Sequence, residues 1–393
     1  MFKKIICNVC SLITLGTCLT SCTQDCDKFE TITIDIDNHR YVTKDDIIEK
    51  VDFIRLETTE DNIISNVSYL HFYKDKVIVT DNYKANAIFV FNKDGKFLNR
   101  ISNYGNGPHE YLDITDVDVT PSGLIVIKDN VKDKLLFFEP NGKFVKERID
   151  IEGGMELAFI DEHSIAFDTF TSHAPTKEKF KGASLAVCDG DNNIQYLFGE
   201  NIAEENVFNV RRPKCLYRYG NKTYFAPHWD KNIYEVTTDS IIAKYRIEFK
   251  PDDVLNYTFR TNQEFEDLIK KHPFFNGSFI EMKDYTLLKY SSNEENSLCI
   301  LYSHKDKKTY TIRNYYDNPL YAYLLKPNTL YKNNTIAEVR HAIHVFGNKH
   351  RIESTLGKTE FTNKLLNGLN MDDNPIIFLF TIKDDIGKYV IEE

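Results

Sequence analysis

Short apolar and aromatic runs, separated by turn-forming residues, recur along most of the chain. The clearest runs are "KVIVTD" (76–81), "AIFVFN" (87–92), "LIVIKD" (124–129) and "KLLFFEP" (134–140), each bounded by Asn, Asp, Gly or Pro. Runs of this length that are rich in Val, Ile and Phe are typical of β-strands. We therefore expect a chain made mostly of short strands, with little helix.

Two neighbouring stretches repeat the same order of elements. The stretches that start at Val77 and Leu124 both read as strand, Asp, polar turn, strand, Asp-Gly or Asn-Gly, and a further strand, and Asp81 and Asp129 lie 48 residues apart. Asp-Gly and Asn-Gly pairs favour tight hairpins because both residues tolerate positive φ. Fainter echoes follow at 184–199, 222–247, 297–312 and 375–392.

A repeat of this length with four strands per unit predicts a β-propeller, in which radial closure protects the sheet edges. The roughly 350 residues that follow the N-terminal region accommodate six blades. The last strand, at 376–383, is expected to complete the blade that begins near "VDFIRLETT" (51–59) and so to close the ring. The predicted fold class is all-β, with a six-bladed propeller spanning residues 46–393.

One stretch, residues 253–282, departs from the strand pattern. Phe265, Leu268 and Ile269 are spaced as on one face of a helix, and Pro273 follows them. This spacing predicts a short helix and loop inserted between blades. Insertions on one rim of a scaffold often line the binding face.

The first 21 residues have the order of a secretory signal, with an apolar run behind Lys3 and Lys4 and small residues before Cys22. The segment Leu19-Thr20-Ser21-Cys22 resembles the bacterial lipobox, whose cysteine becomes the acylated first mature residue. The resemblance implies cleavage before Cys22 and a lipid anchor in the outer membrane, on its surface or its periplasmic face. Residues 22–45 would then form a tether and leader strand. An uncleaved anchor helix is the alternative.

The mature chain is acidic. The full sequence carries a formal net charge of −10, and loss of Lys3 and Lys4 with the signal leaves 47 basic and 59 acidic residues, a charge of −12. Arg211-Arg212 is the only pair of adjacent arginines. Such a balance argues against a nucleic-acid partner, because a phosphate polymer would be repelled.

Four cysteines remain after the lipid-bearing one, namely Cys26, Cys188, Cys215 and Cys299. Their spacing matches neither a CxxC metal pair nor the framework of a small disulfide-rich domain. Single buried thiols are favoured, while up to two disulfides stay open in an oxidising compartment.

The stretch from Phe53 to Val119, together with Asn374-Pro375 before the closing strand, resembles the six-bladed β-propeller lipoproteins of Bacteroidota, which are related to the NHL-repeat type. The resemblance covers the mature chain in order, with its sharpest motifs in the first two blades. It implies the propeller fold, lipid anchoring and a binding role, and it brings no common enzymatic activity.

The stretch "YGNGPHEYLDITDVDVT" (104–120) raises the question of a phosphate-binding loop. Such a loop needs a helix N-terminus behind it, and here a strand is expected. In the family that it resembles, the matching stretch connects consecutive blades, which assigns Gly105 and Gly107 to the turn, Pro108 to its rigidity and Tyr111 to packing between blades. A catalytic pair of His109 with its neighbouring glutamate is disfavoured, because adjacent residues on an extended chain point oppositely.

Three residues are candidates for ligand contact. Trp229, the sole tryptophan, lies beside His228 in "APHWDKN". A tryptophan in a loop can stack on a sugar or on a peptide side chain, and packing between blades is the alternative. His109, which stands where the family usually has a small residue, is the third candidate.

Two stretches resemble parts of metal sites. "DGDNNIQYLFGE" (189–200) has acidic and amide residues at several positions of a calcium loop, but Ile194 replaces the required glycine, so a polar hairpin tip is expected. His341 and His344 lie on an apparent strand, where they would face opposite sides. No cofactor and no metal site is predicted, although calcium or zinc held by single ligands from several blades stays open for the axial channel.

These observations predict a cell-envelope propeller that binds a glycan, a peptide or an envelope protein without catalysis. A metal-dependent lyase or hydrolase that acts in the axial channel is the alternative. A purely structural role in an envelope complex is a third reading.

Overall fold

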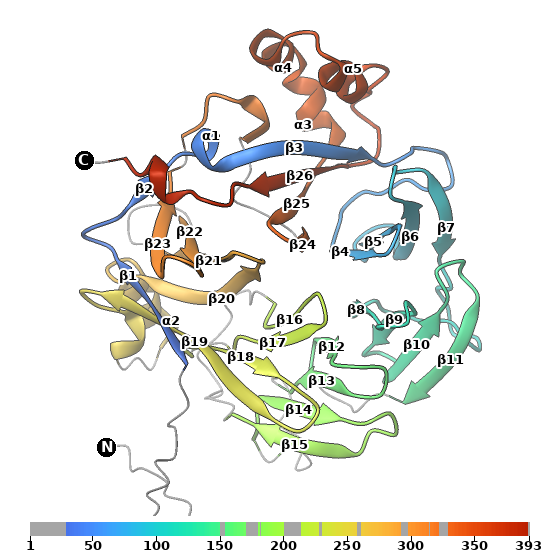
Figure 1. The fold of residues 1–393 in the computed structure, drawn as a ribbon. Coiled ribbons are helices and arrows are strands. Elements are labelled where there is room, and N and C mark those ends of the chain that lie inside the picture. Colours follow the sequence, from blue (N-terminus) through green and yellow to red (C-terminus); the bar gives the residue numbers. More distant parts are fainter. Residues whose placement is uncertain are drawn as a thin grey trace, which may run out of the picture.

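The protein, as a computed structural model, is a six-bladed β-propeller (Figure 1). The structure describes residues 29–149, 154–169, 180, 182–199, 214–227, 230–257, 261–291, 298–313, 315–321 and 329–391. The described strands form six sheets of four or five strands around a common axis. The predicted all-β fold class and the number of blades are therefore confirmed.

Each blade is one sheet, and in three of the six a strand from the N-terminal segment forms the edge away from the axis (Figure 1). Blade 1 contains β4 (Tyr69–Tyr73), β5 (Lys76–Asp81), β6 (Ala87–Asn92) and β7 (Phe97–Ile101). Blade 2 contains β8 (Asp116–Val119), β9 (Ile125–Asp129), β10 (Lys134–Phe138) and β11 (Phe144–Ile149). Blade 3 contains β12 (Leu157–Phe159), β13 (Ile165–Asp168), β14 (Leu185–Cys188) and β15 (Ile194–Phe198).

The second half of the ring uses the N-terminal segment as well as the C-terminal one. Blade 4 contains β16 (Leu216–Tyr219), β17 (Lys222–Phe225), β18 (Asn232–Val236), β19 (Ile241–Lys250) and β1 (Glu30–Asp35). Blade 5 contains β20 (Phe274–Glu281), β21 (Tyr285–Ser291), β22 (Leu298–Ser303), β23 (Lys308–Ile312) and β2 (Tyr41–Val42). Blade 6 contains β24 (Thr329–Lys332), β25 (Thr335–Arg340), β26 (Ile376–Ile382) and β3 (Ile48–Arg55). Three of the fainter echoes of the repeat are therefore parts of blades 3, 4 and 5. Residues 184–199 contain β14 and β15, residues 222–247 contain β17, β18 and most of β19, and residues 297–312 contain β22 and β23.

The N-terminal segment runs along the outside of three blades. Strand β1 adds to β19 in parallel, β2 adds to β23 in parallel, and β3 pairs with β26 in antiparallel register from Arg55 opposite Ile376 to Ile48 opposite Ile382. Figure 1 shows these blue strands beside the yellow, orange and red strands of blades 4 to 6. The short helix α1 (Lys44–Ile47) joins β2 to β3. The predicted closure of the ring by the first and last strands is confirmed.

Asn374 fastens this closure. Its side-chain amide donates to the carbonyls of Glu57 and Asn62, both at 2.8 Å, and its Oδ1 accepts from the amide of Ile64 at 2.8 Å. The residue is 2 % exposed. The side chain of Asn374, just before β26, therefore satisfies three backbone groups of the loop that follows β3.

The repeat noticed in the sequence has a common chemical cause. Asp81 ends β5 and Asp129 ends β9, and both side chains are fully buried. Oδ1 of each accepts from the two amides of the following turn, at 2.9 to 3.1 Å, while Oδ2 accepts from the amide of the connection that enters the blade. In each of these two blades, one carboxylate thus joins the second strand, its turn and the preceding connection.

The Asp-Gly and Asn-Gly turns are the predicted hairpins. Gly95 and Gly142 both have φ of 87°, which is costly for other residues. A Cβ atom on Gly95 would also lie 1.9 Å from the carbonyl oxygen of Arg55 in β3. The glycine in blade 1 is therefore needed for the turn and for its close contact with blade 6.

The helix expected near residue 265 is α2 (Asn262–Ile269), preceded by a 3-10 turn at Val254–Asn256. The expected insertion at 253–282 is too long, because Phe274–Glu281 form β20, the innermost strand of blade 5. Phe275 and Phe279 are buried along this strand. The aromatic run directly after α2 therefore belongs to the sheet of blade 5 and not to the insertion.

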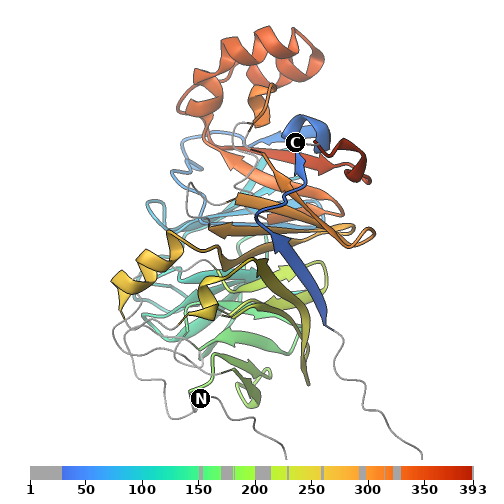
Figure 2. The same ribbon diagram turned by 90° about the vertical axis from the view of Figure 1, so that its left-hand side faces the viewer.

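The prediction of a strand around His341 and His344 is wrong. Strand β25 ends at Arg340, and the chain continues into α3 (Ala342–Gly347), α4 (Lys349–Leu356) and α5 (Glu360–Leu366) before it returns as β26. Ala342 and Val345, three residues apart, are buried on one side of α3. Figures 1 and 2 show these three helices standing out from the rim of the propeller beyond β3.

Buried apolar side chains fill the spaces between neighbouring blades. Cys188, Cys215 and Cys299 are buried free thiols within these clusters, as expected for single thiols. Cys26 lies outside the described residues. Among the helices that the structure describes, none is long and apolar enough to cross a bilayer.

Candidate functional site

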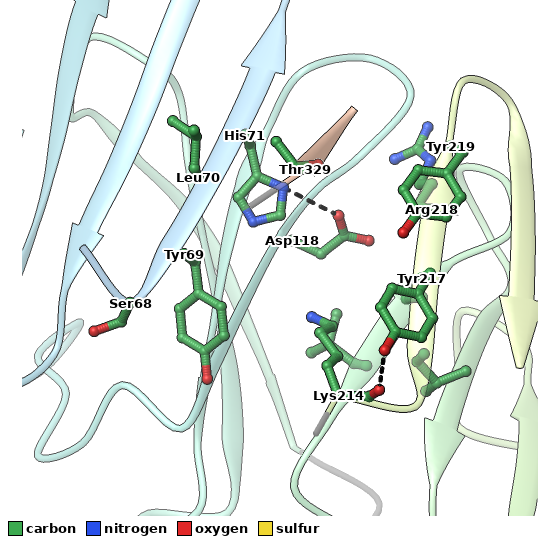
Figure 3. Close-up of a pocket in the computed structure, with 13 residues that line it drawn as sticks. Ser68, Tyr69, Leu70, His71, Asp118, Lys214, Tyr217, Arg218, Tyr219 and Thr329 are labelled. Atoms are coloured by element: carbon green, nitrogen blue, oxygen red, sulfur yellow. Dashed lines mark hydrogen bonds and ion pairs between the residues drawn. The ribbon is translucent and has the colours of Figure 1, made fainter. Parts of the chain in front are cut away.

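A cavity of about 240 Å³ lies on the propeller axis. Its walls come from the innermost strands β4, β8, β12, β16 and β24, which belong to five different blades. Figure 3 shows His71, Asp118, Lys214, Tyr217 and Arg218 gathered around it. Strands β4, β8 and β16 therefore place charged and aromatic side chains against one small space that β12 and β24 help to enclose.

Strand β8 carries two buried carboxylates because the neighbouring strand has free amides. Asp116 Oδ2 accepts from the amide of Leu157 at 2.9 Å, and Asp118 Oδ2 accepts from the amide of Phe159 at 2.8 Å. Both amides belong to β12, whose open edge has no further strand to bond to. The acids of blade 2 thus complete the hydrogen bonding of blade 3.

Lys214, just before β16, neutralises one of these acids. Its Nζ lies 3.1 and 3.3 Å from the two carboxylate oxygens of Asp116 and 5.3 Å from the ring centre of Tyr69. About 30 % of the lysine side chain is accessible from the cavity, whereas Asp116 is not accessible at all. Burial alone would lower the pKa of Lys214, but Asp116 and Glu156 outweigh it and hold this pKa above its usual range.

Glu156 lies on the other side of the same lysine. Its Oε2 accepts from the amides of Cys215 and Leu216, at 2.8 and 2.9 Å. Burial raises the pKa of Glu156, and the attraction of Lys214 opposes that shift only in part. Asp116 is thus bonded directly to the Lys214 ammonium, whereas Glu156 interacts with it electrostatically.

His71, in β4, faces Asp118 across the cavity wall. Its Nδ1 lies 3.9 Å from Asp118 Oδ1, which is too long for a hydrogen bond. Burial lowers the pKa of His71, with the attraction of Asp118 opposing it, so the ring is neutral at neutral pH. Its Nε2 is buried and has no hydrogen-bond partner.

Aromatic rings form a further part of the wall. The hydroxyl of Tyr69 donates to the carbonyl of Thr115 at 2.7 Å, and that of Tyr217 donates to the carbonyl of Lys214. The Tyr217 ring packs edge-on against Phe279 at 4.9 Å between centres. Because both hydroxyls are already engaged, the rings are fixed and present their faces to the cavity space (Figure 3).

The glycine-rich stretch is a connection between blades 1 and 2. A Cβ atom on Gly105 or Gly107 would meet the carboxylate of Glu110 at 2.2 or 2.9 Å, and Oε2 of that glutamate accepts from the amide of Gly107 at 2.5 Å. Pro108 is exposed in this turn. Tyr111 is fully buried in the cluster shared by blades 1 and 2, and its hydroxyl donates to the carbonyl of Asn86 at 2.7 Å.

Of the three candidate residues predicted for ligand contact, the structure describes His109, which lies away from the cavity. His109 stacks on Phe144 of the outer strand β11, with ring centres 3.8 Å apart, and lies 4.0 Å from Glu147. Half of its side chain is exposed, and it does not line the cavity. His228, Trp229 and Cys22 lie outside the described residues.

The two stretches that resembled metal sites are also placed. Residues 189–193 form the turn between β14 and β15, where Asp189 Oδ1 accepts from the amides of Asp191 and Asn193, both at 2.9 Å. Position twelve of the supposed loop, at residue 200, is outside the described residues. His341 and His344 come within 6.2 Å between ring centres at the start of α3. Within the described ranges no group of three or more His, Cys, Asp or Glu residues is arranged to hold a metal ion.

The residues of the cavity were not singled out from the sequence. Their signal is a charged or polar residue inside an otherwise apolar first strand of a blade: His71 in "YLHFY", Asp118 in "DVDV" and Arg218 in "LYRY". A polar residue in a buried strand points to a functional interior only when several blades repeat it at the same depth.

Comparison with known proteins supports the fold. The model of a family described as "Domain of unknown function (DUF4934)" matches residues 29–381. A solved structure described as a "Putative exported protein" from Bacteroides fragilis is 20 % identical, with a TM-score of 0.72 over 90 % of this chain and 99 % of that one. A member of the duf4221 family from Bacteroides vulgatus is 12 % identical, with a TM-score of 0.51 over 88 % of this chain and 99 % of that one. No curated protein matches the chain.

Proposed function

Because the chain belongs to the DUF4934 family, whose description names no activity, we propose a function from the geometry: noncatalytic binding of a small polar ligand in the axial cavity. The observation that carries the proposal is the convergence of charged and aromatic side chains from blades 1, 2 and 4 on one space of about 240 Å³, which blades 3 and 6 help to enclose. This volume is near the lower end of small-molecule sites, which begin at about 300 Å³. A cavity of this size suits a ligand as large as one sugar or one amino acid better than it suits part of a protein surface.

The carboxylates around the cavity are already paired or hydrogen-bonded, which favours ligand binding over metal-dependent chemistry. Asp116 is paired with Lys214, and Asp118 accepts from the amides of Val119 and Phe159. Carboxylates held in this way are structural acceptors, whereas a metal-assisted lyase or hydrolase needs ligands whose oxygens are free to coordinate. A small unit of a glycan or of a peptide is therefore the favoured ligand.

The test of the proposed function is a cavity-filling substitution. Thr329→Phe, at the start of β24, would place a ring in the cavity from the side of blade 6, and we expect at least a tenfold loss of affinity for ligands found by screening monosaccharides, uronic acids and N-acetyl amino acids by thermal shift. Thr31→Phe on the exposed side of β1 adds the same bulk elsewhere and is expected to leave affinity unchanged. Mass spectrometry should recover each bound ligand unaltered. A screen without binders, or a ligand converted during incubation, would contradict noncatalytic binding.

We further propose that this binding takes place at the outer membrane, with the chain anchored by lipid on Cys22. The lipobox resemblance and the signal-like first 21 residues support this proposal. Expressed in a bacterium with the lipoprotein pathway, the full chain is expected to incorporate labelled palmitate, and Cys22→Ser to abolish incorporation. Cys188→Ser, at a buried thiol, is the matched control that should keep the label. Labelling that survived the loss of Cys22 would rule out this anchor.

A further inference from the structure

Arg218 is the one cavity-lining cation without an acidic partner in the described part of the chain. It lies in β16, and one terminal nitrogen of its guanidinium donates to the carbonyl of Val119 in β8. Its Nε is buried and has no hydrogen-bond acceptor. Lys214, the other cation of the wall, is already paired with Asp116.

An unpaired guanidinium in a partly enclosed space is unfavourable, because the charge loses part of its hydration and gains no counter-charge. The acid of the wall, Asp118, is engaged by the amides of Val119 and Phe159. Arg218 therefore has an unbonded donor and a positive charge that no described residue of the chain satisfies.

His71 offers a second unsatisfied position in the same cavity. Its buried Nε2 has no partner, and a neutral imidazole nitrogen can either donate or accept a hydrogen bond, depending on the tautomer. Figure 3 shows His71 and Arg218 on different walls, with Asp118 on a third. A ligand between them would be held at two points by residues from two blades.

We propose that the axial cavity selects ligands that carry a carboxylate, which pairs with the Arg218 guanidinium while a hydroxyl or amide of the same ligand bonds to His71. This inference rests on the proposed function and narrows its ligand class. A planar guanidinium suits a carboxylate because two parallel hydrogen bonds can form between them. Uronic acids and the α-carboxylate of an amino acid both supply this group at a size that suits the cavity.

The experiment compares matched pairs of probes by isothermal titration with the purified protein. Glucuronate is paired with glucose, and N-acetylglycine with N-acetylglycinamide, so that each pair differs in the carboxylate alone. At least one acid is expected to bind at least tenfold more tightly than its neutral partner, and the pair that shows the difference identifies a sugar or an amino acid as the source. Arg218→Gln is expected to weaken binding of that acid about 10- to 100-fold and to leave the neutral partner unaffected. Arg351→Gln, on the exposed side of α4, is the matched control.

A direct probe keeps the inference testable without a tight ligand. Sodium acetate, compared with sodium chloride at the same ionic strength, should shift the Nε–H resonance of Arg218, and Thr329→Phe should suppress the shift. No shift with acetate, or equal affinity for acid and neutral probes, would overturn the carboxylate inference. Neutral sugars that bind as tightly as the matching acids and lose affinity in Thr329→Phe would overturn it while leaving the proposed function intact. Acid binding that survives Thr329→Phe would place the site outside the cavity and refute both.

Discussion

Asp81→Ala is expected to lower the free energy of unfolding by about 4 kcal/mol. The carboxylate is fully buried and accepts from the amides of Ser65, Asn66, Tyr83 and Lys84, and from the Ser65 hydroxyl at 2.6 Å. Alanine would leave several of these donors buried without an acceptor, because the chain around them is held by β5 and β6. Urea unfolding followed by circular dichroism measures the change.

The control for Asp81 is Asp94→Ala, an exposed aspartate in the hairpin turn of the same blade. This substitution is expected to change the unfolding free energy by less than about 0.5 kcal/mol. The same large effect is expected for Asp129→Ala, since that residue plays the matching role in blade 2. Similar small losses at Asp81 and Asp94 would show that the buried carboxylate does not hold the blade together.

The contribution of Asp81 also has a defined pH dependence. Burial alone would raise the pKa of Asp81, but hydrogen bonds from Lys84, Ser65 and Asn66 outweigh it and lower this pKa. A carboxyl group with a lowered pKa stabilises the fold above its ordinary pKa, about 3.9, and loses that contribution as the pH falls through the folded-state pKa. The difference in stability between the wild type and Asp81→Asn should therefore shrink below about pH 4.

Lys214→Met is expected to destabilise the protein by about 3 kcal/mol. The substitution keeps most of the aliphatic volume but leaves the inaccessible Asp116 carboxylate with a single amide donor, that of Leu157. A buried charge that loses its partner is more costly than the pair was favourable. Adding Asp116→Asn to Lys214→Met should restore part of the loss, and a double-mutant cycle measures how much.

Lys222→Met provides the matched comparison on the surface. Lys222 pairs with Glu235 at 2.8 Å, but half of the lysine side chain is exposed. Surface pairs of this kind contribute at most about 1 kcal/mol. If Lys214→Met and Lys222→Met had equal effects, the network around the cavity would have no special energetic role.

The blades could be predicted from the sequence because their signals are local. The hairpins at Gly95 and Gly142 depend on adjacent residues that tolerate positive φ, and the buried aspartates Asp81 and Asp129 recur at one spacing. Even the closure of the ring was predictable, since β26 at the end of the chain needed a partner and β3 supplied one. The fold therefore follows from short-range chemistry repeated at regular intervals.

The helices after β25 and the cavity could not be predicted in the same way. The apolar run around Val345 is too short for its period to separate a strand from one turn of helix, and its helical state depends on packing with α4 and α5. His71 and Arg218 are single polar residues in apolar strands, and only the closed ring brings them to one axis. The position of Trp229 at a ligand site stays a prediction.

The placement of the first strands on the last blades has a consequence for how the chain acquires its structure. Glu30 pairs opposite Tyr245, Tyr41 opposite Thr311 and Arg55 opposite Ile376, so each N-terminal strand waits for a partner made more than two hundred residues later. Blades 1 to 3 can form as they emerge, but β1 lacks its partner until β19 has been made, and β3 exposes open edges until β26 has been made. A chain that stops before β26 would keep those edges open and become prone to aggregation.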